Sequence, residues 1–121
     1  MHSYGGIVGT EAIPEDLTHA ARHAQGHNGG VLHLFYFAGV ILSKGQSVLG
    51  TFGESPNNDV QPDGKVRLKN GTTIIYSDLP AEEGALWESR RVPQSYAMQT
   101  TCSTRAAYEY FPSTYLVCEG D

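Results

Sequence analysis

The chain has 121 residues, of which 40% are apolar and 17% are charged, a composition typical of a folded domain rather than a disordered chain. The net charge of -5 excludes a general nucleic-acid binder, because no basic excess is present to neutralise phosphates. The longest apolar run, residues 31–42, is shorter than the roughly 20 residues of a membrane-spanning helix, so we also expect no membrane partner.

The first 30 residues predict two helices. Residues 3–13 are mostly small and apolar, which suits a tightly packed, buried helix. Residues 14–24 begin with a proline, carry acids in the first turn and continue with good helix formers. The glycines of residues 25–30 then end this helix in a loop.

The middle of the chain predicts a strand followed by an irregular region. Residues 31–40 are apolar throughout, which is typical of a strand buried on both faces. Residues 43–65 are expected to be largely irregular, with a turn at Pro-Asp-Gly, 62–64. In residues 66–76, an Asn-Gly pair between two alternating runs predicts a β-hairpin.

The last third of the chain predicts two helices and a strand. Residues 77–91 indicate a helix with Asp78 as its N-cap, and a short helix is expected over 103–110. Residues 113–121 predict a second buried strand and a loop. Two apolar strands separated by a long crossover indicate an α/β fold with a parallel sheet.

The two cysteines, Cys102 and Cys118, are too few for a disulfide framework. Cys118 lies in the apolar run TYLVC, where we expect a buried, reduced thiol. The first residues lack the basic and apolar segments of a signal peptide. We therefore expect a reducing compartment, the cytoplasm.

A serine motif opens the chain. Met1-His2-Ser3-Tyr4-Gly5, followed by another glycine, is similar to the pattern G-x-S-x-G, in which small residues let a strand turn sharply into a helix and expose the serine oxygen. Methionine replaces the first small residue of that pattern. An ordinary turn with a capping serine is the alternative interpretation.

The motif is followed, in order, by LFYFAGVILSKGQSVLG, YSDLPAEEGALW, PQSYA and PSTYLVCEGD. Together these segments resemble the α/β-hydrolase superfamily, most closely its esterase and hydroxynitrile-lyase-like branch and the fungal relatives there. The resemblance implies a partial α/β-hydrolase domain over residues 1–121, with neighbouring central strands at 31–40 and 114–118 and a cap-like insertion at 43–112. The family's N-terminal half and its C-terminal histidine segment are missing, so we expect a fragment or truncated product.

The resemblance also implies roles for five residues. Ser3 matches the nucleophile, the backbone amide of Tyr4 matches one oxyanion donor, and Gly5 and Gly6 match the elbow glycines. Asp121 matches the acid that orients a histidine. The family order is Ser, Asp, His, but no histidine follows Asp121 here. A small ester-like substrate is implied, with no cofactor and no metal.

The histidines of this chain all precede the position where the family places its base. His19 and His23 have helical spacing for one metal ion, although a solvated helix face is the preferred interpretation. His33 is expected to be a core histidine bonded to the backbone. His2 adjoins Ser3, but neighbours on an extended segment point in opposite directions. The five are His2, His19, His23, His27 and His33.

The sequence therefore predicts a truncated serine hydrolase that is inactive alone, because loss of a triad member costs several orders of magnitude in rate. Ester hydrolysis, cyanohydrin cleavage and acyl transfer remain open for its complete relatives. A non-catalytic remnant that binds a ligand or a protein partner is the alternative. Unpaired strand edges further predict self-association.

Overall fold

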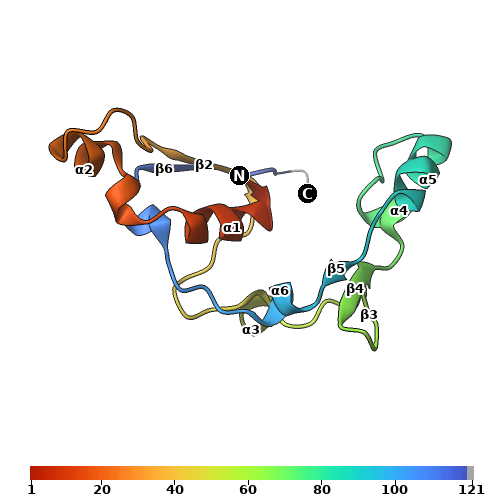
Figure 1. Ribbon diagram of the computed structural model, residues 1–121. Coiled ribbons are helices and arrows are strands. Elements are labelled where there is room, and N and C mark those ends of the chain that lie inside the picture. The colour runs from red at the N-terminus through yellow and green to blue at the C-terminus, as the bar shows by residue number, and fades with distance from the viewer. Residues whose placement is uncertain (120–121) are drawn as a thin grey trace. The chain divides into compact units, whose positions relative to one another are not determined.

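The computed structural model describes residues 1–119, which form two compact units (Figure 1). Unit 1 comprises Met1–Ser47 together with the chain from Cys102 onward. Unit 2 is the intervening segment, Val48–Thr101. None of the helices within the described residues is long and apolar enough to cross a lipid bilayer.

Unit 1 contains a three-stranded sheet in the order β1-β2-β6. The strands are β1 (His2–Ser3), β2 (Leu34–Gly39) and β6 (Ser113–Leu116). Both pairs of neighbours are parallel. The parallel arrangement predicted from two separated apolar runs is therefore confirmed, and the fold is a mixed α/β fold.

The helices of unit 1 differ from the prediction over residues 14–24 and over residues 103–110. A single helix over 14–24 is wrong, because Thr18 is extended (ψ 144°) and its backbone neighbours pair with Val31. The amide of Val31 donates to the carbonyl of Leu17 at 2.8 Å, and His19 donates back to Val31 at 3.0 Å. The Thr18 hydroxyl then caps the next helix by accepting from Ala21. The helical elements of unit 1 are α1 (Gly5–Ala12), η1 (Glu15–Leu17), α2 (His19–Ala24) and η2 (Ala107–Glu109).

The core of unit 1 lies against one face of the sheet. Leu34 and Tyr36 of β2 are buried there with Ala107 and Phe111. From α1, the buried Thr10 joins this core through a 2.9 Å hydrogen bond between its hydroxyl and the Tyr36 hydroxyl. We call this side, covered by α1 and η2, the inner face.

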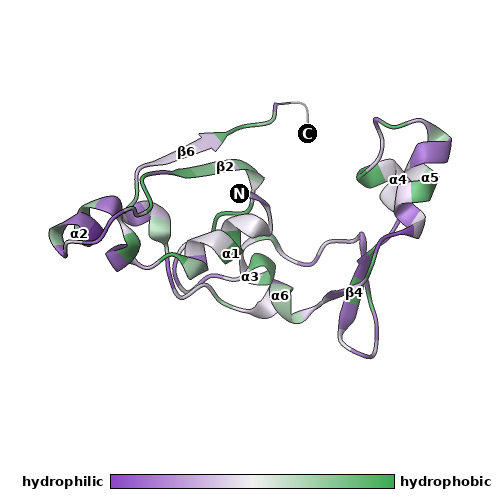
Figure 2. Ribbon diagram, turned by 45° about the horizontal axis from the view of Figure 1, so that its top comes forward, coloured by the Kyte–Doolittle hydropathy of each residue, from purple (hydrophilic) through white to green (hydrophobic). Residues whose placement is uncertain are grey.

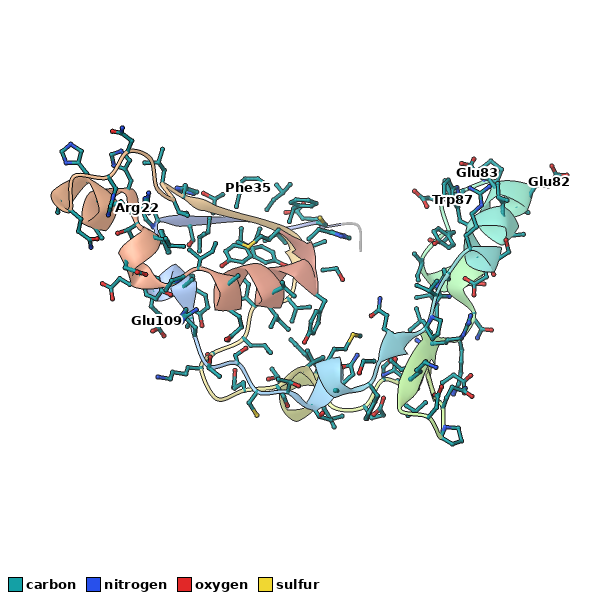
Figure 3. The ribbon with its side chains drawn as sticks, in the orientation of Figure 1. Arg22, Phe35, Glu82, Glu83, Trp87 and Glu109 are labelled. Atoms are coloured by element: carbon teal, nitrogen blue, oxygen red, sulfur yellow. The ribbon has the colours of Figure 1, made fainter. Side chains whose placement is uncertain are left out.

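The opposite face of the same sheet is open. Phe35 is 50% exposed and Phe37 is 41% exposed, and all four residues of β6 are exposed. Figure 3 shows Phe35 on the side of β2 away from α1. The prediction of strands buried on both faces is therefore wrong, because no layer within residues 1–119 covers this side. Cys118, just after β6, is likewise exposed rather than buried.

The chain leaves and re-enters unit 1 at adjacent points. The amide of Gly45 donates to the carbonyl of Ser103 at 2.7 Å, and the amide of Ser103 donates to the carbonyl of Gln46 at 2.7 Å. Ser103 is itself buried. Tyr108 adds a bond from its hydroxyl to the carbonyl of Leu42. These contacts pair the two ends of the segment that forms unit 2.

Unit 2 is built around an antiparallel sheet of order β3-β4-β5. Its hairpin turns at 62–64, as the Pro-Asp-Gly pattern predicted, and Figure 2 shows its mostly hydrophilic character. The helix α3 and the strand β3 thus form within residues 43–65, which were expected to be largely irregular. The elements are α3 (Val48–Phe52), β3 (Asn58–Val60), β4 (Lys65–Leu68), α4 (Gly71–Ile74), α5 (Ala81–Ser89), β5 (Gln94–Ser95) and α6 (Ala97–Thr100).

The hairpin predicted at the Asn-Gly pair is wrong. Asn70 does adopt a left-handed conformation (φ 52°), but it begins the short helix α4 instead of a two-residue turn. β4 pairs with β3 on one side, and β5 takes part of its other edge, at Lys65 and Val66, while residues 71–74 form α4. The helix predicted over 77–91 is present as α5, but Pro80 rather than Asp78 stands at its N-cap. In place of the helix expected at 103–110, only η2 forms.

Candidate active site

Ser3 lies at a sharp turn between a strand and a helix. It is the last residue of β1, and α1 begins two residues later. Its φ is +50°, a left-handed backbone conformation that non-glycine residues rarely adopt. The Ser3 side chain is exposed, and its carbonyl accepts a 2.9 Å hydrogen bond from the amide of Val40. An exposed serine at a sharp turn from strand to helix is compatible with the pattern G-x-S-x-G, and the role of Ser3 as a nucleophile stays a prediction.

A bulge in β2 lies directly opposite this turn. His2 pairs with Phe37, but Ser3 pairs with Gly39, so Ala38 is an extra residue in the ladder. Ala38 also has a positive φ, +40°. Bulges re-aim the chain beside functional sites. Nothing in the sequence signals this bulge, because alanine has no preference for that conformation.

Gly6 allows α1 to approach the end of β2 closely. A Cβ added at Gly6 would lie 2.4 Å from the carbonyl oxygen of Val40, a distance that real Cβ atoms do not reach. Gly5, by contrast, has no atom within 4 Å of an added Cβ. Val40 therefore contacts both sides of the turn, through its amide to Ser3 and its carbonyl to Gly6.

The backbone amides after Ser3 are open to a ligand. Tyr4 stands at the N-cap of α1, and its carbonyl accepts from Ile7 at 3.0 Å and Val8 at 3.2 Å. Its amide donates to no backbone or side-chain acceptor within residues 1–119. The first amides of a helix also lack intrahelical acceptors and carry partial positive charge. An oxyanion beside Ser3 could therefore be stabilised by these amides.

No histidine is hydrogen-bonded to Ser3 within residues 1–119. The His2 ring stacks on Phe37 with centroids 5.3 Å apart. His33 is exposed and bonds the Thr114 hydroxyl at 2.8 Å, so its predicted place in the core, bonded to backbone, is wrong.

The paired helical histidines have no third metal-ligating side chain beside them among the described residues. His19 and His23 stack on each other, with ring centroids 6.1 Å apart. Among the described residues, no group of three or more histidine, cysteine, aspartate or glutamate side chains could hold a metal ion. The exposed helix face is the better description of this pair.

Asp121, the predicted acid, lies outside the described residues. The strand that leads towards it, β6, runs parallel to β2, and β2 runs parallel to β1. The carboxyl ends of parallel strands meet at one edge of a sheet, so Ser3 and the carboxyl end of β6 share an edge. Functional groups in open α/β sheets gather at this edge.

A cavity of about 370 Å³ lies at the other edge of the sheet. Its lining includes Val31 and Pro112, which precede the amino ends of β2 and β6, together with His19 and Tyr110. Figure 1 shows α2 near this end of unit 1 and the N-terminus near the other. The cavity is therefore not a substrate pocket for Ser3.

The sequence did not predict a cluster of hydrogen bonds in unit 1 between Glu11, Thr104 and Arg105, which we call the carboxylate clamp. The Glu11 carboxylate, at the end of α1, accepts from the amide of Thr104 at 2.7 Å, its hydroxyl at 2.7 Å and the amide of Arg105 at 2.9 Å. Arg105 also donates to the Glu11 carbonyl. Partial burial raises the pKa of Glu11, but these hydrogen bonds outweigh it and hold the pKa below its usual value. The clamp fixes the far end of the helix that follows Ser3.

The fold and the serine turn define a class, a mixed α/β protein with an exposed nucleophile candidate at the carboxyl edge of a parallel sheet. The chain is similar to the alpha/beta hydrolase nvfD of Aspergillus novofumigatus (strain IBT 16806), at 27% identity over an alignment of 130 residues. The alignment covers 99% of this chain and 49% of the relative, so the chain spans about half the length of the curated relative it matches. No family model and no solved structure matches the chain. The similarity supports the α/β-hydrolase superfamily.

Proposed function

We propose that the chain carries the nucleophile of a serine hydrolase whose complete form hydrolyses small esters. The observation that supports this most is the backbone of Ser3, held at φ +50° between β1 and α1. In the proposed reaction the Ser3 hydroxyl oxygen attacks the ester carbonyl carbon. The resulting oxyanion is stabilised by the amide of Tyr4 and a second donor.

The proposed reaction needs two further groups. A histidine must take the proton of Ser3 and give it to the leaving alcohol as the ester C–O bond breaks, and a water molecule must then hydrolyse the acyl-serine. Asp121 is assigned the role of orienting that histidine. Within residues 1–119 no histidine contacts Ser3 through a hydrogen bond. We therefore propose that the chain by itself is inactive and represents the part of a hydrolase from the nucleophile turn to the triad acid.

The remaining assignments follow from the resemblance. We propose that residues 43–112, which include unit 2, are the cap-like insertion of this hydrolase and that it belongs to the esterase and hydroxynitrile-lyase-like branch. The free thiols of Cys102 and Cys118 are compatible with a reducing compartment, the cytoplasm. A non-catalytic role in ligand or protein binding is the second candidate, favoured because no histidine is hydrogen-bonded to Ser3 among the residues that the structure describes.

A chimera tests the proposal. This chain would replace the matching half of the Aspergillus relative, and hydrolysis of p-nitrophenyl acetate would be measured after circular dichroism confirms a folded protein. Ser3→Ala and Asp121→Asn should each lower the rate about 10³-fold or more. Ser77→Ala, a change at an exposed serine, is the matched control and should leave the rate unchanged.

Two results would contradict the proposal. A folded, active chimera that keeps its full rate after Ser3→Ala would remove Ser3 from the mechanism. Ser3-dependent hydrolysis by the isolated chain would show that the chain itself contains a working base.

A further inference from the structure

A tyrosine of the neighbouring strand reaches the bulge in β2. β6 lies beside β2 in the sheet (Figure 1), and the hydroxyl of Tyr115, in β6, donates a 2.9 Å hydrogen bond to the carbonyl of Gly39. Gly39 directly follows the bulged residue Ala38 and pairs with Ser3. A bulge disrupts the ladder locally, so a side-chain hydrogen bond at this point supports a backbone conformation that the ladder does not fix by itself.

The Tyr115 ring is anchored on the core of unit 1. Tyr115 pairs in register with Tyr36 of β2, so both side chains leave the sheet on its inner face. Their rings stack with centroids 6.4 Å apart and planes inclined by 17°. Tyr36 has no exposed surface, and its hydroxyl is bonded to that of Thr10. The hydroxyl that reaches Gly39 is therefore carried by a ring whose position the core already fixes.

The bulged segment, residues 38–40, contacts the serine turn on two sides. The amide of Val40 donates to the carbonyl of Ser3 at 2.9 Å. The carbonyl oxygen of Val40 lies so close to α1 that a Cβ added at Gly6 would be 2.4 Å from it. The left-handed conformation of Ser3 persists only where the surrounding structure over-determines it. A shift of the bulged segment would therefore shift the backbone of Ser3.

We propose that Tyr115 is a positioning residue for the serine turn: its hydroxyl holds the bulge of β2, and the bulge holds the backbone of Ser3. Its effect on rate rests on the proposed function, because the position of Ser3 matters to hydrolysis only if Ser3 is the nucleophile. Displacement of a reacting group by about 1 Å can lower a rate about 100-fold. Tyr115 acts through Ser3 rather than on the substrate, so loss of its hydroxyl should lower kcat and leave KM nearly unchanged.

Hydrogen exchange on the 121-residue chain, followed by NMR, tests the hold on the bulge without any measurement of activity. Tyr115→Phe keeps the stacked ring and removes only the hydroxyl. In this variant the amide of Val40 should exchange about 5-fold faster or more, because its hydrogen bond to Ser3 opens more readily. The amide of Leu34, at the other end of β2, is bonded to the carbonyl of Pro112 and should exchange at the wild-type rate.

The chimera with the Aspergillus relative tests the effect on rate. There Tyr115→Phe should lower kcat for p-nitrophenyl acetate about 10-fold and change KM by less than about twofold. Tyr110→Phe is the matched control, because it removes a 2.7 Å hydrogen bond from another tyrosine hydroxyl of unit 1 to a backbone carbonyl, that of Ile13. It should leave both kcat and the exchange of the Val40 amide unchanged.

Three results would overturn the proposal. The Val40 amide could exchange at the wild-type rate in Tyr115→Phe. Equal acceleration at Val40 and Leu34 would show that the hydroxyl stabilises the sheet as a whole rather than the bulge. Faster exchange at Val40 with unchanged kcat, in a chimera that Ser3→Ala inactivates, would show that the bulge does not position the nucleophile.

Failure of the proposed function gives a different pattern. In that case Ser3→Ala leaves the chimera at its full rate. The exchange of the Val40 amide then decides by itself whether Tyr115 holds the serine turn.

Discussion

Seven of the eight buried apolar side chains within residues 1–119 belong to unit 1, and unit 2 contributes only Val66. Unit 1 is assembled from segments far apart in the sequence, such as Leu34 and Ser113. Unit 2 is assembled mainly from neighbours, with β3 and β4 joined by a short turn. Exposed large apolar side chains occur in both units, so the difference lies in the buried ones; those exposed in unit 2 are Phe52, Val60, Ile74, Ile75, Leu86, Trp87 and Val92.

The two units also differ in their non-glycine residues at positive φ, a conformation that persists only where the surrounding structure over-determines it. Unit 1 holds Ser3 and Ala38 in this conformation, whereas unit 2 holds Asn70, a residue type that adopts it more readily. Regions with few buried apolar contacts open at lower free energy. We therefore expect unit 2 to open before unit 1, and the predictions below test this difference.

The largest effect is expected from Tyr36→Ala. Tyr36 has no exposed surface, stacks on Tyr115 and bonds the hydroxyl of Thr10, so its truncation should lower the free energy of unfolding by about 3–5 kcal/mol. Val66→Ala in unit 2 should cost only about 2 kcal/mol. Denaturant titrations with hydrogen-exchange mass spectrometry would separate the two units. Equal losses for the two variants, or loss of protection confined to unit 2, would contradict the comparison.

Two glycine substitutions should have opposite signs. Gly6→Ala forces a Cβ against the Val40 carbonyl and should cost about 1–3 kcal/mol. Gly84→Ala, in the middle of α5, meets only ordinary contacts with Tyr76 and should stabilise by up to about 1 kcal/mol. Thermal unfolding measures both effects.

Gly5→Ala is the local control for Gly6, since open space surrounds its added Cβ. Its melting temperature should stay close to that of the wild type. If Gly5→Ala and Gly6→Ala destabilise equally, the cause is the loss of glycine from the turn rather than the close approach to Val40.

The smallest effect is expected from Glu11→Gln, which weakens the clamp to Thr104 and Arg105 by about 1 kcal/mol at neutral pH. The folded-state pKa of Glu11 is lowered, so its contribution is complete above the usual glutamate pKa and is lost as the pH falls through the lowered value. The melting temperatures of wild type and variant should therefore converge in acid. A constant difference at every pH would show that the Glu11 charge is not responsible.

Sequence patterns correctly predicted those elements whose formation depends mainly on nearby residues. The turn at 62–64, the helix that became α5 and the parallel relation of the two apolar runs are present. The sharp serine turn also follows from residues 3–6, because glycines leave room for it. These features depend on neighbouring residues or on the length of the crossover, both visible in the sequence.

Tertiary partners decided the features that could not be predicted. Asn70 takes the expected left-handed conformation, but the chain continues into α4 and β5, from further along the sequence, takes part of the free edge of β4, so no hairpin forms there. Apolar composition alone could not reveal that Phe35 and Cys118 would be exposed, because burial depends on a covering layer. Glu11 meets Thr104 across 93 residues of sequence, and no short-range pattern signals that contact.

Backbone hydrogen bonds join Ser103 to Gly45 and Gln46. They hold the two ends of the segment that forms unit 2 together, and all of their atoms belong to unit 1. The entropic cost of closing a loop rises slowly with its length, so the stability of the unit 1 sheet depends only weakly on the length of the segment that forms unit 2. The length of the segment that forms unit 2 can therefore change at small cost to the sheet of unit 1.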